Sequence, residues 1–182
     1  MTELTFSITF HGPFHIANGS SRGGVTTVDQ AEPLPATSLK GVLRASAKRL
    51  LGTDSRLVKD VFGAGRAPSP WRWSPAVLED DPEPRPEARV CIDPDTGAAR
   101  DDMLAFTEHL QPSRAASFRI TQFGFLEGKD AKLHRNVLAI SAQAVRSIGA
   151  LRRRGLGWVS IRCTNFEPGP AEVREFLQWR NA

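Results

Sequence analysis

The sequence predicts an α+β fold of the ferredoxin-like or RNA-recognition-motif-like type, with the element order βαββαβ and insertions between the elements. Three observations carry this prediction: an alternating strand pattern begins the chain, two helical patterns flank a strand-rich middle, and a second alternating strand lies near the end. We expect one domain over residues 1–182, because this length is sufficient for one well-buried core and short for two.

The first strand is predicted over Leu4–Phe10, where apolar residues alternate with threonine and serine. Residues 11–24 then contain several glycines, a proline and an asparagine, which predict a long mobile loop. A short β-prone run, Val25–Asp29, follows this loop.

The first helix is predicted over residues 39–51, where apolar residues recur at helical spacing. Thr37 or Ser38 is the expected N-cap, because a hydroxyl side chain can accept a hydrogen bond from the first turn. A shorter helix is expected from Asp54 to Phe62, ended by Gly63.

The middle of the chain is predicted to hold an irregular proline-rich insertion at about residues 64–90. Within it, residues 71–78 have the composition of a strand interrupted at Pro75. The elements expected after it are strands at Arg89–Asp93, Leu104–Leu110 and Ala116–Phe123, a helix over 130–148, a strand over 158–163 and a short helix over 171–179.

The connection between the second long helix and the last strand, Ser147–Val159, combines backbone freedom with positive charge. Glycine permits positive φ and close approach to the main chain, and arginine presents a planar fork of donors that matches phosphate oxygens. This connection therefore predicts a site for a polyanion, with a solvated basic turn as the alternative reading. The residues concerned are Gly149, Arg152, Arg153, Arg154, Gly155 and Gly157.

Charge is distributed unevenly along the chain. Residues 79–108 carry ten acidic and three basic side chains, whereas residues 109–182 carry twelve basic and five acidic ones. The first helix adds a basic stripe, Lys40, Arg44 and Lys48, on the face expected to lie opposite its core stripe. This distribution favours a nucleic acid over a membrane surface as partner, and with no apolar run of membrane-spanning length we expect a cytoplasmic protein.

Three stretches together resemble the RAMP superfamily of CRISPR proteins, and most closely the backbone subunit of type III effector complexes. Leu34–Arg44 resembles the family's proline-rich approach followed by S-x-K-G-x-x-R on the first helix. Val90–Ala99 with Leu104–Glu108 resembles its central hairpin, and Ile148–Val159 resembles its glycine-rich loop. The order and spacing fit over most of residues 4–164.

The resemblance implies a subunit that polymerises with copies of itself and other effector subunits along CRISPR RNA, and that meets complementary target RNA. It adds weight to the basic helix and the glycine-rich loop as contacts for RNA phosphates. A loop histidine is usually a polar surface residue or an RNA contact, and only less often a general acid or base. The RNA-binding residues expected are Lys40, Arg44, Lys48, Gly149, Arg152, Arg153, Arg154, Gly155, Gly157, His15 and Arg22.

The resemblance also implies a catalytic aspartate in the loop before the first helix, and Asp29 stands at that place upstream of Ser38–Gly41. Its carboxylate would bind a divalent cation, Mg²⁺ or Mn²⁺, or orient the ribose 2′-hydroxyl in an endoribonuclease reaction. Two alternatives remain open: a non-catalytic RAMP subunit that binds guide RNA only, in which Asp29 is a turn former, and an RNA-binding domain of the same fold unrelated to CRISPR.

Overall fold

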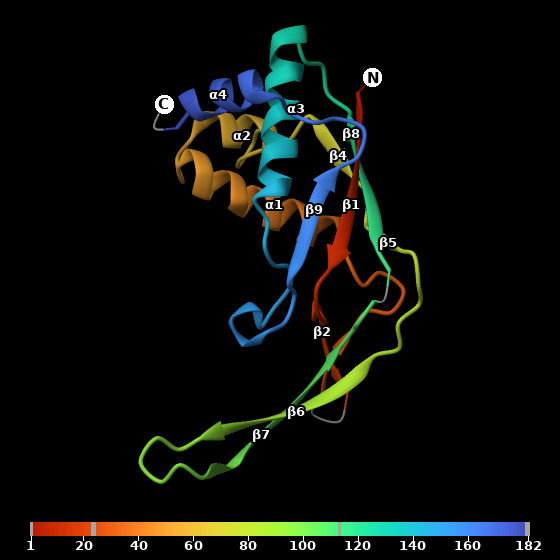
Figure 1. Cartoon of the computed structure of the whole chain (residues 1–182), viewed down its shortest axis with the longest axis vertical. Helices are drawn as coiled ribbons and strands as arrows, with labels where there is room; N and C mark the ends of the chain where they lie inside the picture. The colour runs from red at the N-terminus through yellow and green to blue at the C-terminus, as the bar shows by residue number, and fades with distance from the viewer. Residues whose placement is uncertain (1, 23–24, 113, 181–182) are drawn as a thin grey trace.

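The structure is a computed structural model that describes residues 2–22, 25–112 and 114–180. An antiparallel sheet with four principal strands forms its centre (Figure 1). The strands are β1 (Glu3–Phe10), β4 (Trp71–Trp73), β8 (Ala116–Gln122) and β9 (Val159–Cys163). Their spatial order is β4-β8-β1-β9, so the first strand, β1, lies between β8 and the last strand, β9. This order, with a helix after the first and third of these strands, is that of a βαββαβ ferredoxin-like domain and confirms the predicted fold class.

The edge of this sheet contains the interrupted strand expected at Pro75. β5 (Val77–Leu78) continues β4 along β8, but Trp73 pairs with Ile120 and Val77 with Ser117, so four positions on the edge oppose three on β8. The extra residue is a bulge, which accommodates a proline that has no N–H to donate.

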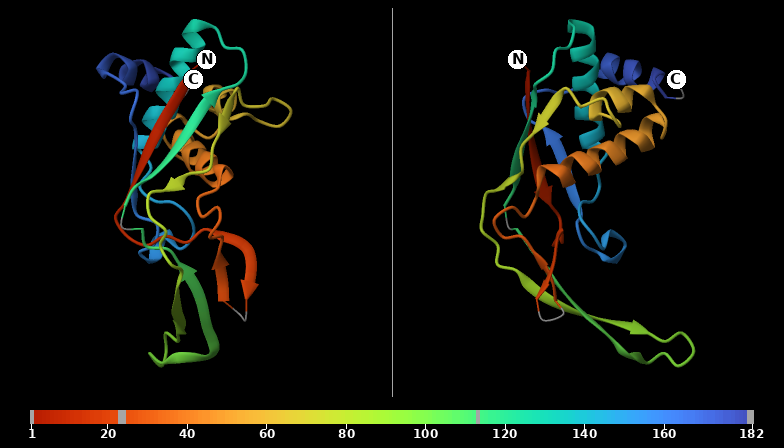
Figure 2. Two further views of the ribbon diagram at one scale, coloured as in Figure 1. Left: turned by 90° about the vertical axis from the view of Figure 1, so that its right-hand side faces the viewer. Right: turned by 180° about the vertical axis from the view of Figure 1, so that it is seen from behind.

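The α-helices that the structure describes cover one face of the central sheet (Figure 2). They are α1 (Ala36–Leu51), α2 (Arg56–Phe62), α3 (Gly128–Gln143) and α4 (Pro170–Gln178), and a stacked pair of rings, Phe6 and Phe118 with centroids 4.9 Å apart, lies in the core beneath them. None of the helices in the described ranges is long and apolar enough to cross a membrane.

Two helix boundaries differ from the expected ones. α1 begins after Pro35 without a side-chain cap, so the expected Thr37 or Ser38 cap is wrong. α3 ends at Gln143, five residues before the expected end at Ile148. Ile148 is nevertheless buried, because the chain beyond the helix continues to fill the core.

A second sheet extends from one end of the central sheet (Figure 1). Its order is β2-β3-β7-β6, where β6 and β7 form a long hairpin and β3 pairs with β7 in parallel. These strands are β2 (Ala17–Arg22), β3 (Val25–Val28), β6 (Arg85–Ile92) and β7 (Ala99–His109).

Two expectations about the second sheet change. The segment expected to be a loop, residues 11–24, contains β2, while its Gly23 and Gly24 lie outside the described residues. The segment expected to be irregular, residues 64–90, ends in the first part of β6, in addition to β4 and β5 of the central sheet, where the interrupted strand over residues 71–78 was expected. Strand pairing supplies the backbone hydrogen bonds that a polar or proline-rich composition does not predict.

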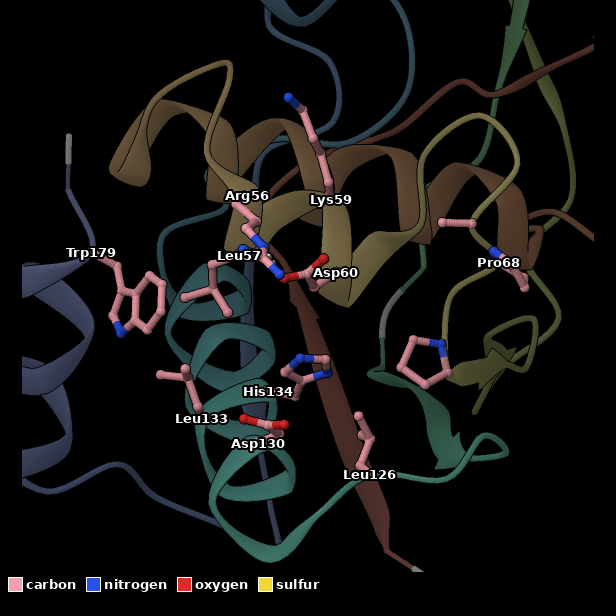
Figure 3. Close-up of a pocket in the computed structure, with 12 residues that line it drawn as sticks. Arg56, Leu57, Lys59, Asp60, Pro68, Leu126, Asp130, Leu133, His134 and Trp179 are labelled. Carbon is pink, nitrogen blue, oxygen red and sulfur yellow. Dashed lines mark ion pairs between the residues drawn. The ribbon is translucent and has the colours of Figure 1, made fainter. Parts of the chain in front are cut away.

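His134 is a buried polar side chain on α3, 5% exposed, at the floor of a pocket between α2 and α3 (Figure 3). The indole N–H of Trp71 donates a hydrogen bond of 3.2 Å to its Nδ1. Burial lowers the pKa of His134 below the ordinary 6.5, against the opposing charges of Asp130 and Asp60. The imidazole is therefore neutral at pH 7 in the folded protein, with Nδ1 as an acceptor.

Acidification is expected to destabilise the protein through His134. Because its folded pKa lies below its unfolded one, the unfolded state binds the proton first as pH falls through about 6.5, and the free energy of unfolding decreases there. Urea unfolding of wild type and His134→Gln at pH 7.5 and 5.5 measures this, and the variant should lose less stability between the two values. Equal losses in both proteins would contradict the assignment.

Candidate nucleic-acid interface

The glycine-rich loop displays three arginines on one short turn. An antiparallel bridge between Ser147 and Trp158 closes the loop at its base. Arg152, Arg153 and Arg154 form a single 3-10 turn, η1, and all three are exposed. The turn is bounded by left-handed residues, Leu151 at φ 58° and Gly155 at φ 83°.

Two of the loop glycines are packed against the protein's own backbone. A Cβ on Gly149 would overlap the carbonyl oxygen of His15, and one on Gly157 would overlap that of Ile148. The N–H of Gly157 donates to the carbonyl of Pro13 at 2.7 Å, and Gly157 is buried. The close approach that Gly157 makes in this structure is therefore to another part of the chain, and its expected contact with RNA stays a prediction.

His15 joins the loop to the second sheet instead of facing solvent. Its side chain is 2% exposed, and Nδ1 lies 2.6 Å from the carbonyl oxygen of Glu108. Its own carbonyl accepts a hydrogen bond of 2.8 Å from the N–H of Ala150. The expected contact between the His15 side chain and RNA is not available in this arrangement, because the imidazole is enclosed.

A groove of about 500 Å³ separates the glycine-rich loop from the β6–β7 hairpin. Leu151 and Arg154 line it on the loop side. Arg89 lines it on the hairpin side, where its guanidinium pairs with Glu87 at 3.0 Å. Arg154 therefore brings positive charge to this groove that no ion pair among the described residues neutralises.

Asp29 follows β3 directly and begins a turn that leads to α1. Its Oδ1 accepts hydrogen bonds from the N–H groups of Ala31 at 2.9 Å and Glu32 at 3.2 Å, and the side chain is exposed. The preceding residue, Val28, donates its N–H to the carboxylate of Glu108 at 3.1 Å. Asp29 is thus held at a defined place beside β7.

Glu32 and Glu108 were not expected at this site. Glu32 shares a small pocket of about 220 Å³ with Asp29. The sequence feature that could have indicated this is the position of Glu32 three residues after an aspartate in a turn. Glu108 is 80 positions from Val28 in sequence, so no local pattern indicates their contact.

The donor set around Asp29 fits a divalent cation only in part. Within the described ranges, no three histidine, cysteine, aspartate or glutamate side chains come together as a metal site. Two carboxylates do line one pocket, and magnesium is commonly bound by one or two carboxylates together with substrate phosphates and water. A cation here would share its coordination with RNA.

The basic residues of α1 flank the core instead of lying opposite to it. Lys40, Arg44 and Lys48 each follow a buried residue by one position, about 100° around the helix, and all three are half-buried. Partial burial lowers the pKa of Lys40, and the nearby charge of Arg44 adds to this. The exposed line of α1 consists of Thr37, Gly41, Ala45 and Arg49.

The remaining predicted contact, Arg22, has a side chain outside the described part of the structure. The described contacts bring the glycine-rich loop and the hairpin to one groove, and Asp29 and Glu32 to a separate pocket. Among the residues that the structure describes, Lys40, Arg44 and Lys48 line neither the groove nor the pocket.

These features define the chain as a ferredoxin-like α+β protein with a basic, glycine-rich loop before its last strand. The chain belongs to the RAMP superfamily, whose family model matches residues 7–160. Its fold is similar to a chain in the cryo-EM structure of the Type III-B Cmr-beta bound to cognate target RNA, with a TM-score of 0.69 and 12% sequence identity over 90% of this chain and 97% of that one. No curated protein matches the sequence.

Proposed function

We propose that this chain is a backbone subunit of a type III CRISPR effector complex and binds CRISPR RNA without reading its sequence. The observation that carries the proposal is the turn of three exposed arginines, Arg152–Arg154, held in place by backbone packing at Gly149 and Gly157. Membership of the RAMP superfamily supports it, and so does a fold neighbour from the structure of the Type III-B Cmr-beta bound to cognate target RNA.

The chemistry of the loop suits phosphate better than a base edge. Guanidinium groups form paired hydrogen bonds with phosphate oxygens, and such contacts position a nucleic acid without carrying sequence information. Because the loop's shape is set by its own backbone contacts, the arginines are presented together and RNA need not order them.

The β6–β7 hairpin supports protein partners for the same subunit. It projects from the body of the molecule (Figure 1), and acidic residues predominate in it. Apolar side chains exposed on such a projection are typical of surfaces that contact another protein, here other effector subunits or copies of this chain. They are Val90, Ile92, Met103 and Leu104.

Within this function, Asp29 is the candidate for cutting complementary target RNA. Its Oδ1 accepts the two turn hydrogen bonds, and Oδ2 takes no part in that turn. With Glu32 in the same pocket, a divalent cation, Mg²⁺ or Mn²⁺, would supply charge stabilisation at the scissile phosphate. The residues of the chain would hold that cation and orient the ribose 2′-hydroxyl.

A non-catalytic guide-binding subunit is the second candidate. The observation in its favour is the same turn, because two hydrogen bonds to Oδ1 account for an aspartate at position 29 without any chemistry.

Reversal of the loop charge tests the RNA-binding proposal. Arg152→Glu/Arg153→Glu/Arg154→Glu is expected to weaken binding of single-stranded RNA at least about tenfold at low salt, equally for unrelated sequences. Loss of three phosphate contacts should also reduce the slope of log affinity against log salt by about 2. Fluorescence anisotropy with labelled RNA over a salt series measures both quantities.

The matched control is Arg56→Glu/Arg174→Glu/Arg180→Glu, which changes the net charge equally with exposed residues on the helical side. Its affinity should stay within about threefold of wild type. Equal losses in both triple variants would show that only net charge matters, and unchanged affinity in the loop variant would make the loop a turn with no RNA contact.

A further inference from the structure

The central sheet has a second face that no described element covers. Leu4, Phe6 and Ile8 of β1 are buried beneath the helices, so the alternate residues of β1 point to the opposite side. The helices all lie on the first side (Figure 2), and the second sheet extends from the end of the central one. The opposite side is therefore an open face.

Three arginines cross this open face diagonally, one on each of three strands. Arg162 of β9 pairs with Ser7 of β1, and Arg119 of β8 pairs with Thr5 of β1. From Arg162 to Arg119 the line therefore moves two residues along β1. Arg72 of β4 pairs with Thr121, which itself pairs with Glu3.

From the usual spacings of strands and residues, the Cα atoms of successive arginines lie about 12 Å and about 8 Å apart along this line. All three arginines are exposed, and no ion pair among the described residues involves them. We call Arg162, Arg119 and Arg72 the arginine diagonal.

An exposed aromatic side chain stands at each end of the arginine diagonal. Trp158 precedes β9, is 60% exposed, and its ring lies 4.8 Å from that of His11. Phe123 follows β8, is 69% exposed, and carries the guanidinium of Arg72 at 4.5 Å from its ring centroid. Both rings are large exposed apolar surfaces of the kind on which nucleic-acid bases stack.

We propose that the open face is a second binding surface for single-stranded RNA, with phosphates on the arginine diagonal and bases on Trp158 and Phe123. Single-stranded nucleic acid is bound by this combination of a basic track with aromatic platforms, because every base has a face that can stack. Hydroxyl side chains between the arginines add donors for phosphate and ribose oxygens. They are Ser7, Thr5, Ser117 and Ser160.

The composition of the open face favours RNA over a protein partner. The centre of a protein interface is depleted of charge and rich in apolar contact, whereas this face has arginines and hydroxyls at its centre. On the open face, Val77 at the β5 edge is an exposed aliphatic side chain and Glu3 of β1 is an acidic one. A groove of about 600 Å³ runs along the outer edge of β9 beside the diagonal, and Arg146, Glu167 and Arg162 itself are its charged lining residues.

The surface is continuous with the glycine-rich loop, because Trp158 follows Gly157 directly and lies four positions after Arg154. The inference rests on the proposed RNA-binding function and extends it: one strand held at the loop could continue across the open face, or a second strand could be held there.

Anisotropy with a labelled 20-nucleotide oligouridine and with a 20-base-pair RNA duplex tests this surface. Arg119→Glu/Arg162→Glu is expected to lose at least about tenfold in affinity for the single strand and about 1.4 in salt slope, with a smaller loss for the duplex. Trp158→Ala should lose about fivefold for the single strand with no change in salt slope. Arg174→Glu/Arg180→Glu carries the same charge change on the helical side and should stay within about twofold.

Arg119→Gln/Arg162→Gln, with a thermal melt for each variant, separates a binding loss from a folding loss, since glutamine keeps the polarity of these positions without introducing a negative charge. Ultraviolet crosslinking of the wild-type protein to oligouridine should yield adducts in peptides that contain Trp158 or Phe123.

If the diagonal variants bind like their control while the loop triple variant does not, the open face is not an RNA surface and the proposed function stands. If both sets bind like wild type, or wild type binds no RNA, both proposals fail. A change in sedimentation of the diagonal variants without a change in RNA affinity would assign the face to a protein contact and overturn the inference.

Discussion

Replacing Asp29 by asparagine is expected to abolish cutting of target RNA, with a loss of at least about 100-fold, because a positioned acid–base or metal-binding carboxylate contributes on that order. Asparagine retains an Oδ1 acceptor for the N–H groups of Ala31 and Glu32, so the turn is preserved while the charge is lost. The measurement is single-turnover cleavage by the complex assembled with guide, complementary RNA and magnesium.

Asp29→Ala and Glu32→Gln complete this experiment. Alanine removes both the charge and the turn hydrogen bonds, and glutamine at position 32 removes the second carboxylate of the pocket. If catalysis uses the carboxylate, the asparagine and alanine variants both lose cleavage while binding of guide RNA persists. If Asp29 only forms the turn, the asparagine variant cleaves like wild type. If the wild-type complex leaves the target RNA uncut, the chain is a non-catalytic subunit that only binds guide RNA.

Gly149→Ala is expected to lower the free energy of unfolding by about 3 kcal/mol or more. Two costs add at this position: a left-handed backbone at φ 74°, which costs a non-glycine residue about 1–2 kcal/mol, and overlap of the new Cβ with the carbonyl oxygen of His15. The overlap is with backbone, so no side-chain rotation relieves it. Urea unfolding followed by circular dichroism measures the difference.

Gly155→Ala is the matched control, because Gly155 has φ 83° in the same loop but has open space where its Cβ would be. Only the backbone cost applies there, so a loss of about 1–2 kcal/mol is expected. The difference between the two variants isolates the contact of the loop with His15. Equal destabilisation would mean that the loop does not rest on the segment before β2.

The glycine-rich loop illustrates how far a motif can be interpreted. Three glycines beside three arginines predict a polyanion site, and the exposure of Arg152, Arg153 and Arg154 agrees with that reading. The same pattern does not reveal that Gly149 and Gly157 are required by contacts within the chain. Those contacts are with residues far away in sequence or across the loop, which local spacing does not encode.

Sequence alone determined the elements whose patterning is local. Alternation predicts β1 and β9, helical spacing predicts α1 and α3, and the proline at position 75 predicts an interrupted strand. Each of these signals is set by neighbouring residues and by the period of one element. The order of these elements was sufficient to predict the ferredoxin-like fold.

The tertiary structure alone decided which segments meet. It pairs β3 with β7, encloses His15 against the carbonyl of Glu108, and holds Val28 through the carboxylate of Glu108. It also aligns arginines of three different strands on one open face. These outcomes depend on strand register and on contacts between positions 49 or more residues apart. Such contacts form only when burial of the common core brings the strands together, so the composition of each segment by itself does not predict them.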